Sequence, residues 1–101
     1  YGFEMVYCEQ LTVAEQVALF AEATCILGAH GAGLTNLLFS QPGTTVIEIY
    51  NRMYWVDCFR KVDSLLGHDH WYMFADNESI ETWSTRVDTR KLDKLLSYAL
   101  K

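Results

Sequence analysis

The chain has 101 residues, half of them hydrophobic and 21% charged, which allows one small domain with a core but no second substrate domain. The formal net charge is −5 and no cluster of lysine and arginine stands out, so the electrostatic footprint of a nucleic-acid-binding protein is missing. No apolar run reaches the roughly 20 residues that a membrane-spanning helix needs.

The three cysteines, Cys8, Cys25 and Cys58, give information about the cellular compartment of the protein. They are widely spaced and none belongs to a CxxC pair, so we predict buried, reduced thiols that pack as small hydrophobic side chains. Since nothing indicates stabilising disulfides, a bacterial cytoplasm is favoured over the lumen of the endoplasmic reticulum or Golgi.

Strand-like and helix-like patterns alternate in the first part of the chain. Residues 3–8 are rich in β-formers and are predicted to be a strand. Thr12 and Glu15 have the spacing of a capping box, which predicts a helix over residues 13–23. The short apolar run at 24–28 is typical of a strand buried on both faces.

The alternation continues to the end of the chain and predicts an α/β fold, a three-layer Rossmann-like parallel sheet with right-handed crossovers. Residues 1–101 are interpreted as one domain, and because the chain opens directly in a predicted strand, we expect a fragment of a larger protein. The further predicted elements are a helix from about 31–33 to 39, ended by Pro42-Gly43; a strand at 44–50; a helix that carries Trp55, Val56, Phe59, Val62 and Leu66 and ends at Gly67; a strand at 71–74; an irregular stretch at 77–88; and a last helix from 88 or 89.

The segment at 28–36 has the composition of an anion-binding turn, because three glycines and two alanines fall within residues 28–33, after a predicted strand and at the start of a helix. A bare backbone can approach an anion closely, and the N–H groups and dipole of the first helical turn favour negative charge. The spacing G-x-x-G-x-G is neither the dinucleotide fingerprint nor the Walker loop. A tight turn that only lets the helix pack on the sheet is therefore an open alternative.

Polar residues of this segment are candidates for ligand contact. His30 can donate to a phosphate oxygen or titrate near neutral pH, which also makes it a candidate catalytic residue; alternatively, backbone groups hold its ring. Thr35 and Asn36 either reach a ligand or are ordinary polar residues of the helix.

Glu48 lies among residues that are predicted to be buried, where a carboxylate is costly unless it is hydrogen-bonded or paired. It can accept two hydrogen bonds from vicinal hydroxyls, as acidic residues do for ribose in dinucleotide folds, or it can hold the N–H groups of a neighbouring loop. His68 and His70 flank Asp69, and we interpret this H-D-H stretch as a solvated turn rather than as a metal site, because no third ligand is apparent.

The sequence as a whole resembles the glycosyltransferase 61 family, which includes plant xylosyl- and arabinosyltransferases, animal enzymes that add N-acetylglucosamine to proteins, and bacterial capsule-type relatives. The resemblance covers residues 9 to 50 well, and its specific part is the combination of H-G-A-G-L, a following P-G and V-I-E. The matching residues are Glu15-Gln16, Phe20, Ala23, the run from Ile26 to Asn36, Phe39, Pro42-Gly43 and Val46 to Ile49.

The resemblance implies the C-terminal half of a GT-B glycosyltransferase, which binds the nucleotide sugar while a missing N-terminal domain of the same chain supplies the general base. The reaction implied is transfer from a UDP-sugar to a hydroxyl of a glycan or protein acceptor, with inversion. The residues implied to contact the donor are His30, Gly31, Ala32, Gly33, Asn36 and Glu48, and no metal or tightly bound cofactor is expected. The alternative is a non-catalytic α/β module that binds a phosphorylated small molecule or a protein partner.

Overall fold

The computed structural model of the chain describes residues 2–29, 32–50, 58–77, 85–86 and 88–100. His30 and Gly31, the loop at 51–57 with Trp55 and Val56, and most of the stretch at 78–87 lie outside the described residues. For Ala32 and Gly33 the backbone is described and the surroundings of the side chains are not.

Three parallel strands form the sheet, in the order β1-β2-β3: β1 (Cys25–Ala29), β2 (Thr45–Tyr50) and β3 (Asp69–Phe74). β2 pairs with a strand on each side, and its last five residues are all buried. This burial explains why the β-branched run of the sequence ends up in the centre of the sheet. The predicted α/β class with a parallel sheet is confirmed.

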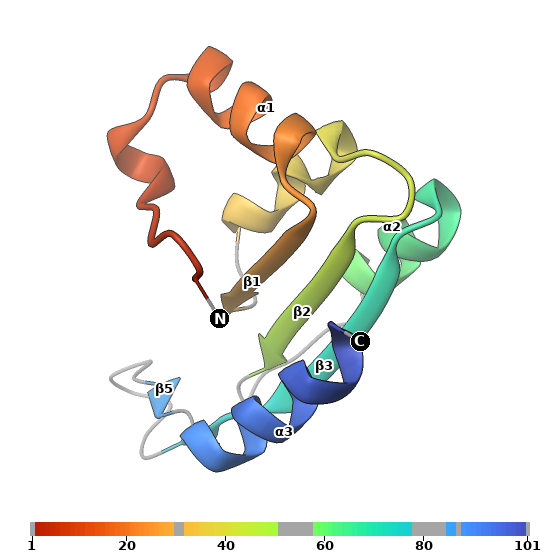
Figure 1. Ribbon diagram of the computed structural model, residues 1–101. Helices are drawn as coiled ribbons and strands as arrows, with labels where there is room; N and C mark the ends of the chain where they lie inside the picture. The colour runs from red at the N-terminus through yellow and green to blue at the C-terminus, as the bar shows by residue number, and fades with distance from the viewer. Residues whose placement is uncertain (1, 30–31, 51–57, 78–84, 87, 101) are drawn as a thin grey trace.

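Helices lie on both sides of the sheet, since α3 (Thr89–Ala99) crosses in front of β3 and α2 (Cys58–Leu66) lies behind it (Figure 1). α1 (Val13–Glu22) runs across the end of the sheet where β1 begins (Figure 1). The main core cluster is formed between α1, the η2 helix (Ala32–Phe39), α2 and the sheet; it consists of Phe20, Leu34, Leu37, Val46 and Phe59. Short elements complete the described chain: η1 (Cys8–Gln10), β4 (Asp76–Asn77) and β5 (Thr85–Arg86).

The segment between β1 and β2 forms a 3-10 helix, η2, and not the predicted α-helix. The distance that this connection has to cover gives a physical reason for the 3-10 form. A 3-10 helix rises about 2.0 Å per residue, so eight residues span roughly 16 Å, which matches the length of a five-residue strand at ~3.3 Å per residue. An α-helix of eight residues would span only about 12 Å.

The prediction of a strand at residues 3–8 is wrong. This segment has no strand partner among the described residues, and it passes into η1 at Cys8. Residues of this segment line a cavity beside β1 and do not form a strand paired with β1. Strand propensity describes how well side chains pack on a sheet, and it cannot replace a partner strand. The stretch predicted to be irregular at 77–88 includes the last residue of β4 and all of β5, which form a short antiparallel pair.

Two expectations of burial also need correction. β1 is half-buried at four of its residues and exposed at Ala29, so it is not a strand buried on both faces. Cys58 is exposed, at the first position of α2, and Cys8 and Cys25 are partly buried. All three thiols are free.

The capping box at the start of α1 is present as predicted. The Thr12 hydroxyl accepts from the Glu15 N–H at 3.1 Å, and the Glu15 carboxylate accepts from the Thr12 N–H at 2.9 Å. The Thr12 backbone N–H, followed by its side chain, lowers the pKa of Glu15. A carboxylate with a lowered pKa stabilises the fold above its unfolded value of about 4.3 and loses this effect as the pH falls through the folded value.

We predict that Thr12→Ala lowers the free energy of unfolding by about 1 kcal/mol at pH 7, because the helix loses its N-cap. The difference from the unsubstituted protein should shrink below about pH 4, since protonation of Glu15 removes the other half of the box. Urea unfolding at both pH values measures the effect. The matched control is Thr89→Ala, at the first position of α3, and an equal loss in this variant would contradict the assignment.

The cysteines should differ in their reaction with iodoacetamide. Burial raises the pKa of the Cys25 thiol, and the thiolate is the reactive form. We therefore expect Cys58 to be alkylated several times faster than Cys25 at pH 8, as followed by peptide mass spectrometry. Equal rates in the folded protein would contradict the described burial.

Candidate functional site

The turn between β1 and η2 depends on a glycine for close packing. A Cβ atom at Gly28 would lie 3.2 Å from the Cδ2 atom of Leu34, in the first turn of η2, and Leu34 belongs to the core. Gly28 is not among the described glycines with positive φ, so its role is close approach and not backbone conformation. The alternative in which small residues let the helix pack on the sheet is therefore confirmed for Gly28, and it is compatible with anion binding by the residues that follow.

Asn36 ties η2 to α1. Its Nδ2 donates to Gln16 Oε1 at 2.7 Å, and Gln16 Nε2 in turn donates to the carbonyls of Cys8 and Leu11, at 2.9 and 3.2 Å. The amide of Asn36 thus has a structural partner in the present state. Contact of Asn36 with a ligand stays a prediction.

Glu48 lies directly beside the glycine turn. In the parallel register it is paired with Gly28 on one side and with Tyr72 on the other. It is the fourth of six residues in β2, so two residues separate it from the end of the strand, and its exposed fraction is 0%. A ligand can reach this carboxylate only when the groups around it move.

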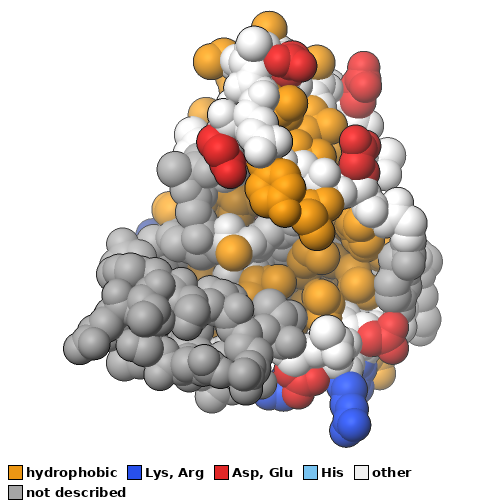
Figure 2. Space-filling view, turned by 90° about the vertical axis from the view of Figure 1, so that its left-hand side faces the viewer, with side chains coloured by type: hydrophobic (Ala, Val, Ile, Leu, Met, Phe, Trp, Pro, Cys, Tyr) orange, Lys and Arg blue, Asp and Glu red, His pale blue; other side chains and the backbone are white. Residues whose placement is uncertain are grey.

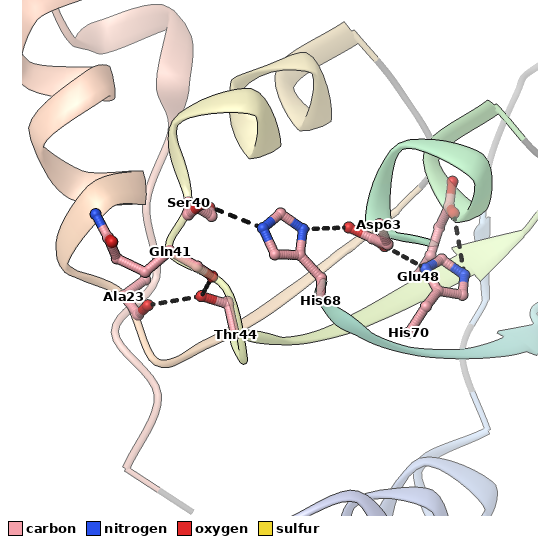
Figure 3. A network of polar contacts seen from close by, with 8 residues as sticks. All are labelled: Ala23, Ser40, Gln41, Thr44, Glu48, Asp63, His68 and His70. Atoms are coloured by element: carbon pink, nitrogen blue, oxygen red, sulfur yellow. Dashed lines mark hydrogen bonds and ion pairs between the residues drawn. The ribbon is translucent and has the colours of Figure 1, made fainter. Parts of the chain in front are cut away.

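The neighbour of Glu48 on the same face of the sheet is His70 of β3. His70 is the register partner of Val46, two residues before Glu48, and residues two apart on a strand share a face. His70 Nε2 lies 3.6 Å from Glu48 Oε1, and both side chains are enclosed, with exposed fractions of 7% and 0% (Figure 3).

Asp63 of α2 holds His70 from the other side and holds His68 as well (Figure 3). Its Oδ2 lies 2.5 Å from His70 Nδ1, and its Oδ1 lies 2.7 Å from His68 Nδ1. The second ring nitrogen of His68 lies 3.2 Å from the carbonyl oxygen of Ser40. These contacts join α2, β3, β2 and the end of η2 in one buried polar chain, which we call the histidine–carboxylate chain: Ser40, His68, Asp63, His70 and Glu48.

The two rings of this chain differ in their contacts. Both nitrogens of His68 lie within hydrogen-bonding distance of an oxygen, and so does Nδ1 of His70. Nε2 of His70 lies 3.6 Å from Glu48 Oε1, beyond hydrogen-bonding distance, and has no hydrogen-bond partner among the described residues. The ring of His70 thus stands between two buried carboxylates, each of which is costly to bury alone.

The interpretation of His68-Asp69-His70 as a solvated turn is wrong, since His68 is buried and His70 nearly so. The sequence held a signal for this. Asp63 follows Phe59 by four residues and therefore lies on the buried face of α2, as the structure confirms for both residues. A carboxylate on that face needs a partner, and the two histidines were available. In the described part of the chain no group of three or more histidine, cysteine or acidic residues is arranged to hold a metal ion.

A second feature of the molecule is a cavity of about 480 Å³ between residues 3–8, α1 and β1. Hydrophobic side chains gather in the middle of this face and acidic side chains stand around them (Figure 2). Glu4 and Glu22 are among the lining residues. Gly28, Ala29 and Leu34 also line this cavity, so it reaches the start of the glycine-rich turn. An apolar hollow with carboxylates at its border is unsuited to a diphosphate, so the anion-binding prediction applies to the backbone of the turn and not to the apolar wall of the cavity.

Comparison with known proteins shows a relation to glycosyltransferases. The sequence model of the family described as Glycosyltransferase 61 matches residues 1–47, which include the glycine-rich turn and end one residue before Glu48. A beta-1,2-xylosyltransferase of Arabidopsis thaliana is 31% identical over 71 residues, which are 70% of this chain and 13% of the relative.

Two further relatives are similar over shorter stretches. A beta-1,2-xylosyltransferase of rice is 46% identical over 44 residues, covering 44% of this chain and 8% of the relative. An EGF domain-specific O-linked N-acetylglucosamine transferase of Drosophila melanogaster is 37% identical over 51 residues, which cover 50% of this chain and 10% of the relative. The chain thus spans about a tenth of the length of these relatives. No solved structure matches it.

An α/β sheet with a glycine-rich turn after its first strand, together with these relatives, defines the class: the chain is related to glycosyltransferases. The matching family model is that of glycosyltransferase 61, over residues 1–47, and the resemblance predicted from the sequence is confirmed. No helix in the described residues is long and apolar enough to cross a membrane.

We predict that Asp63→Asn lowers the free energy of unfolding by roughly 3–5 kcal/mol, because two buried histidines lose their common anion. Thermal or urea unfolding measures the loss. The matched control is Asp69→Asn at the exposed start of β3, where the carboxylate accepts from Trp71 Nε1 at 2.9 Å, and about 0.5 kcal/mol or less is expected. Similar losses in both variants would refute the special role of Asp63.

Proposed function

We propose that this chain forms the donor-binding part of a glycosyltransferase that transfers a sugar from a UDP-sugar to an acceptor hydroxyl with inversion. The observation that carries the proposal is the position of the glycine-rich turn, which leads from a parallel strand into η2, within the segment that matches the family. The relatives are named for the transfer of xylose and of N-acetylglucosamine, so a sugar donor is the ligand class that they have in common.

The diphosphate of the donor would lie at the start of η2. β1 ends at Ala29 and η2 begins at Ala32, so the turn is short and rich in small residues, and the first N–H groups of the helix are free of intrahelical partners. Backbone N–H groups and the positive end of a helix dipole favour an anion there. Such groups also stabilise the charge that develops on the departing diphosphate, and the imidazole of His30 would add a further donor.

Glu48 would bind the ribose. It is the register partner of Gly28 on the neighbouring strand. A carboxylate can accept two hydrogen bonds from the vicinal hydroxyls, as in dinucleotide folds. Since Glu48 is fully buried in the present state, this contact requires a rearrangement of the surrounding groups when the donor binds.

The remaining parts of the reaction belong to the rest of the protein. The GT-B arrangement, in which this chain is the C-terminal half, places the acceptor and the general base on a second domain across a cleft. The acceptor is a hydroxyl of a glycan or of a protein. The apolar cavity beside β1 is not proposed to hold the diphosphate.

The proposal is tested by calorimetric titration of the full-length protein with UDP. We expect binding that weakens roughly tenfold in His30→Ala and in Glu48→Gln, since each variant removes a hydrogen bond to a charged group. The matched control for the glutamate is Glu22→Gln, an exposed residue at the end of α1, which should bind UDP like the unsubstituted protein. Circular dichroism establishes that each variant is folded. An absence of UDP binding, or binding that neither variant changes, would refute the proposal.

A further inference from the structure

We infer that Asp63 and His70 are positioning residues that hold Glu48 charged and in place for the donor, an inference that rests on the proposed function. Nothing in the family match points to these two residues, since it ends at residue 47. The inference comes from the juxtaposition of three elements: β2 carries Glu48, β3 carries His70, and α2 carries Asp63 (Figure 3).

The first step of the argument is that the His70 ring is fixed at one end. Its Nδ1 lies 2.5 Å from Asp63 Oδ2, and Asp63 is itself held through its other oxygen by His68. Asp63 has an exposed fraction of 0%, so water does not compete for its oxygens. A carboxylate that is bound at both oxygens cannot rotate freely, and the ring that it holds is therefore oriented.

The second step is that the free end of this ring points at Glu48. His70 Nε2 lies 3.6 Å from Glu48 Oε1, and no described residue accepts a hydrogen bond from this buried nitrogen. The separation is a few tenths of an ångström longer than a hydrogen bond, so the contact is electrostatic and leaves the carboxylate some freedom to adjust. Polar contacts of this kind commonly tighten only when a substrate binds.

The third step concerns the charge of Glu48. A buried carboxyl group without a nearby cation is held in its neutral form, and a neutral carboxyl group is a poorer acceptor for two ribose hydroxyls. In this proposal the ring of His70, which stands beside Glu48 Oε1, supplies the cation, and Asp63, bound at its Nδ1, orients the ring. His70 thus acts on the donor through Glu48 and does not touch the donor itself.

His68, two positions before His70 in the chain, provides a matched control. His68 and His70 are both enclosed and both bind Asp63, but the second nitrogen of His68 faces the carbonyl of Ser40 and not Glu48. Replacement of either histidine by glutamine removes a buried partner of Asp63, and both variants should therefore lose thermal stability. Only the loss of His70 should affect the donor.

The experiment measures UDP affinity of the full-length protein by calorimetry, with folding checked by thermal unfolding, for His70→Gln, His68→Gln, Glu48→Gln and the double variant of Glu48 and His70. We expect His70→Gln to weaken UDP binding roughly tenfold and His68→Gln less than about twofold. The double variant should bind about as weakly as Glu48→Gln alone, because both changes remove the same interaction.

Three results would overturn the inference. They are unchanged UDP affinity in His70→Gln while Glu48→Gln binds weakly, equal weakening in the two histidine variants, or additive effects in the double variant. Failure of the proposed function looks different, because the unsubstituted protein would then not bind UDP, or Glu48→Gln would bind it normally. In that case the inference falls together with the proposed function, before any histidine is changed.

Discussion

The structure depends on the neutralisation of two carboxylates that have no contact with solvent. Glu48 lies in the central strand and Asp63 lies on the buried side of α2, and each would strongly destabilise the fold if it stood alone. Two histidines of the β3 region bring α2 and β2 together through these carboxylates. The apolar core packs on the same side of the sheet, beside this polar chain.

The same contacts connect the interior to the turn at the end of β1. Glu48 is paired in the sheet with Gly28, and Gly28 is pressed against Leu34, the first core residue of η2. A charge at position 48 is therefore separated from the turn only by the width of one strand pair. This proximity connects the buried chain with the donor that we propose to bind at the turn.

The sequence allowed most of the sheet to be predicted and only part of the site. Parallel strands followed from alternation and from the β-branched run at residues 44–50, and the cap of α1 followed from two residues at a fixed spacing. The strand predicted at 3–8 failed because propensity does not supply a partner strand. The 3-10 form of η2 could not be predicted, since the distance that a connection must cover is fixed only when both strands are placed.

The site was predictable where chemistry is local and unpredictable where it is brought together by folding. The glycine-rich turn is contiguous, so its composition alone led to the prediction of anion binding, which stays a prediction. The histidine–carboxylate chain uses residues from β2, α2 and β3, and only the position of Asp63 relative to Phe59 indicated that a buried acid had to be matched. The sequence indicated that burying Glu48 is costly. It did not indicate the partner, because His70 is 22 positions away along the chain and only folding brings the two residues together.

The hydrogen bond between Asn36 and Gln16 has a mechanical consequence. Gln16 is also bonded to the carbonyls of Cys8 and Leu11, so η2, α1 and η1 are fastened at a single amide. A shift of η2 would consequently pull α1 and η1 with it, and residues of both elements form walls of the apolar cavity. The volume of that cavity would thus change together with the conformation of the glycine-rich turn, whose residues Gly28 and Ala29 line the same cavity.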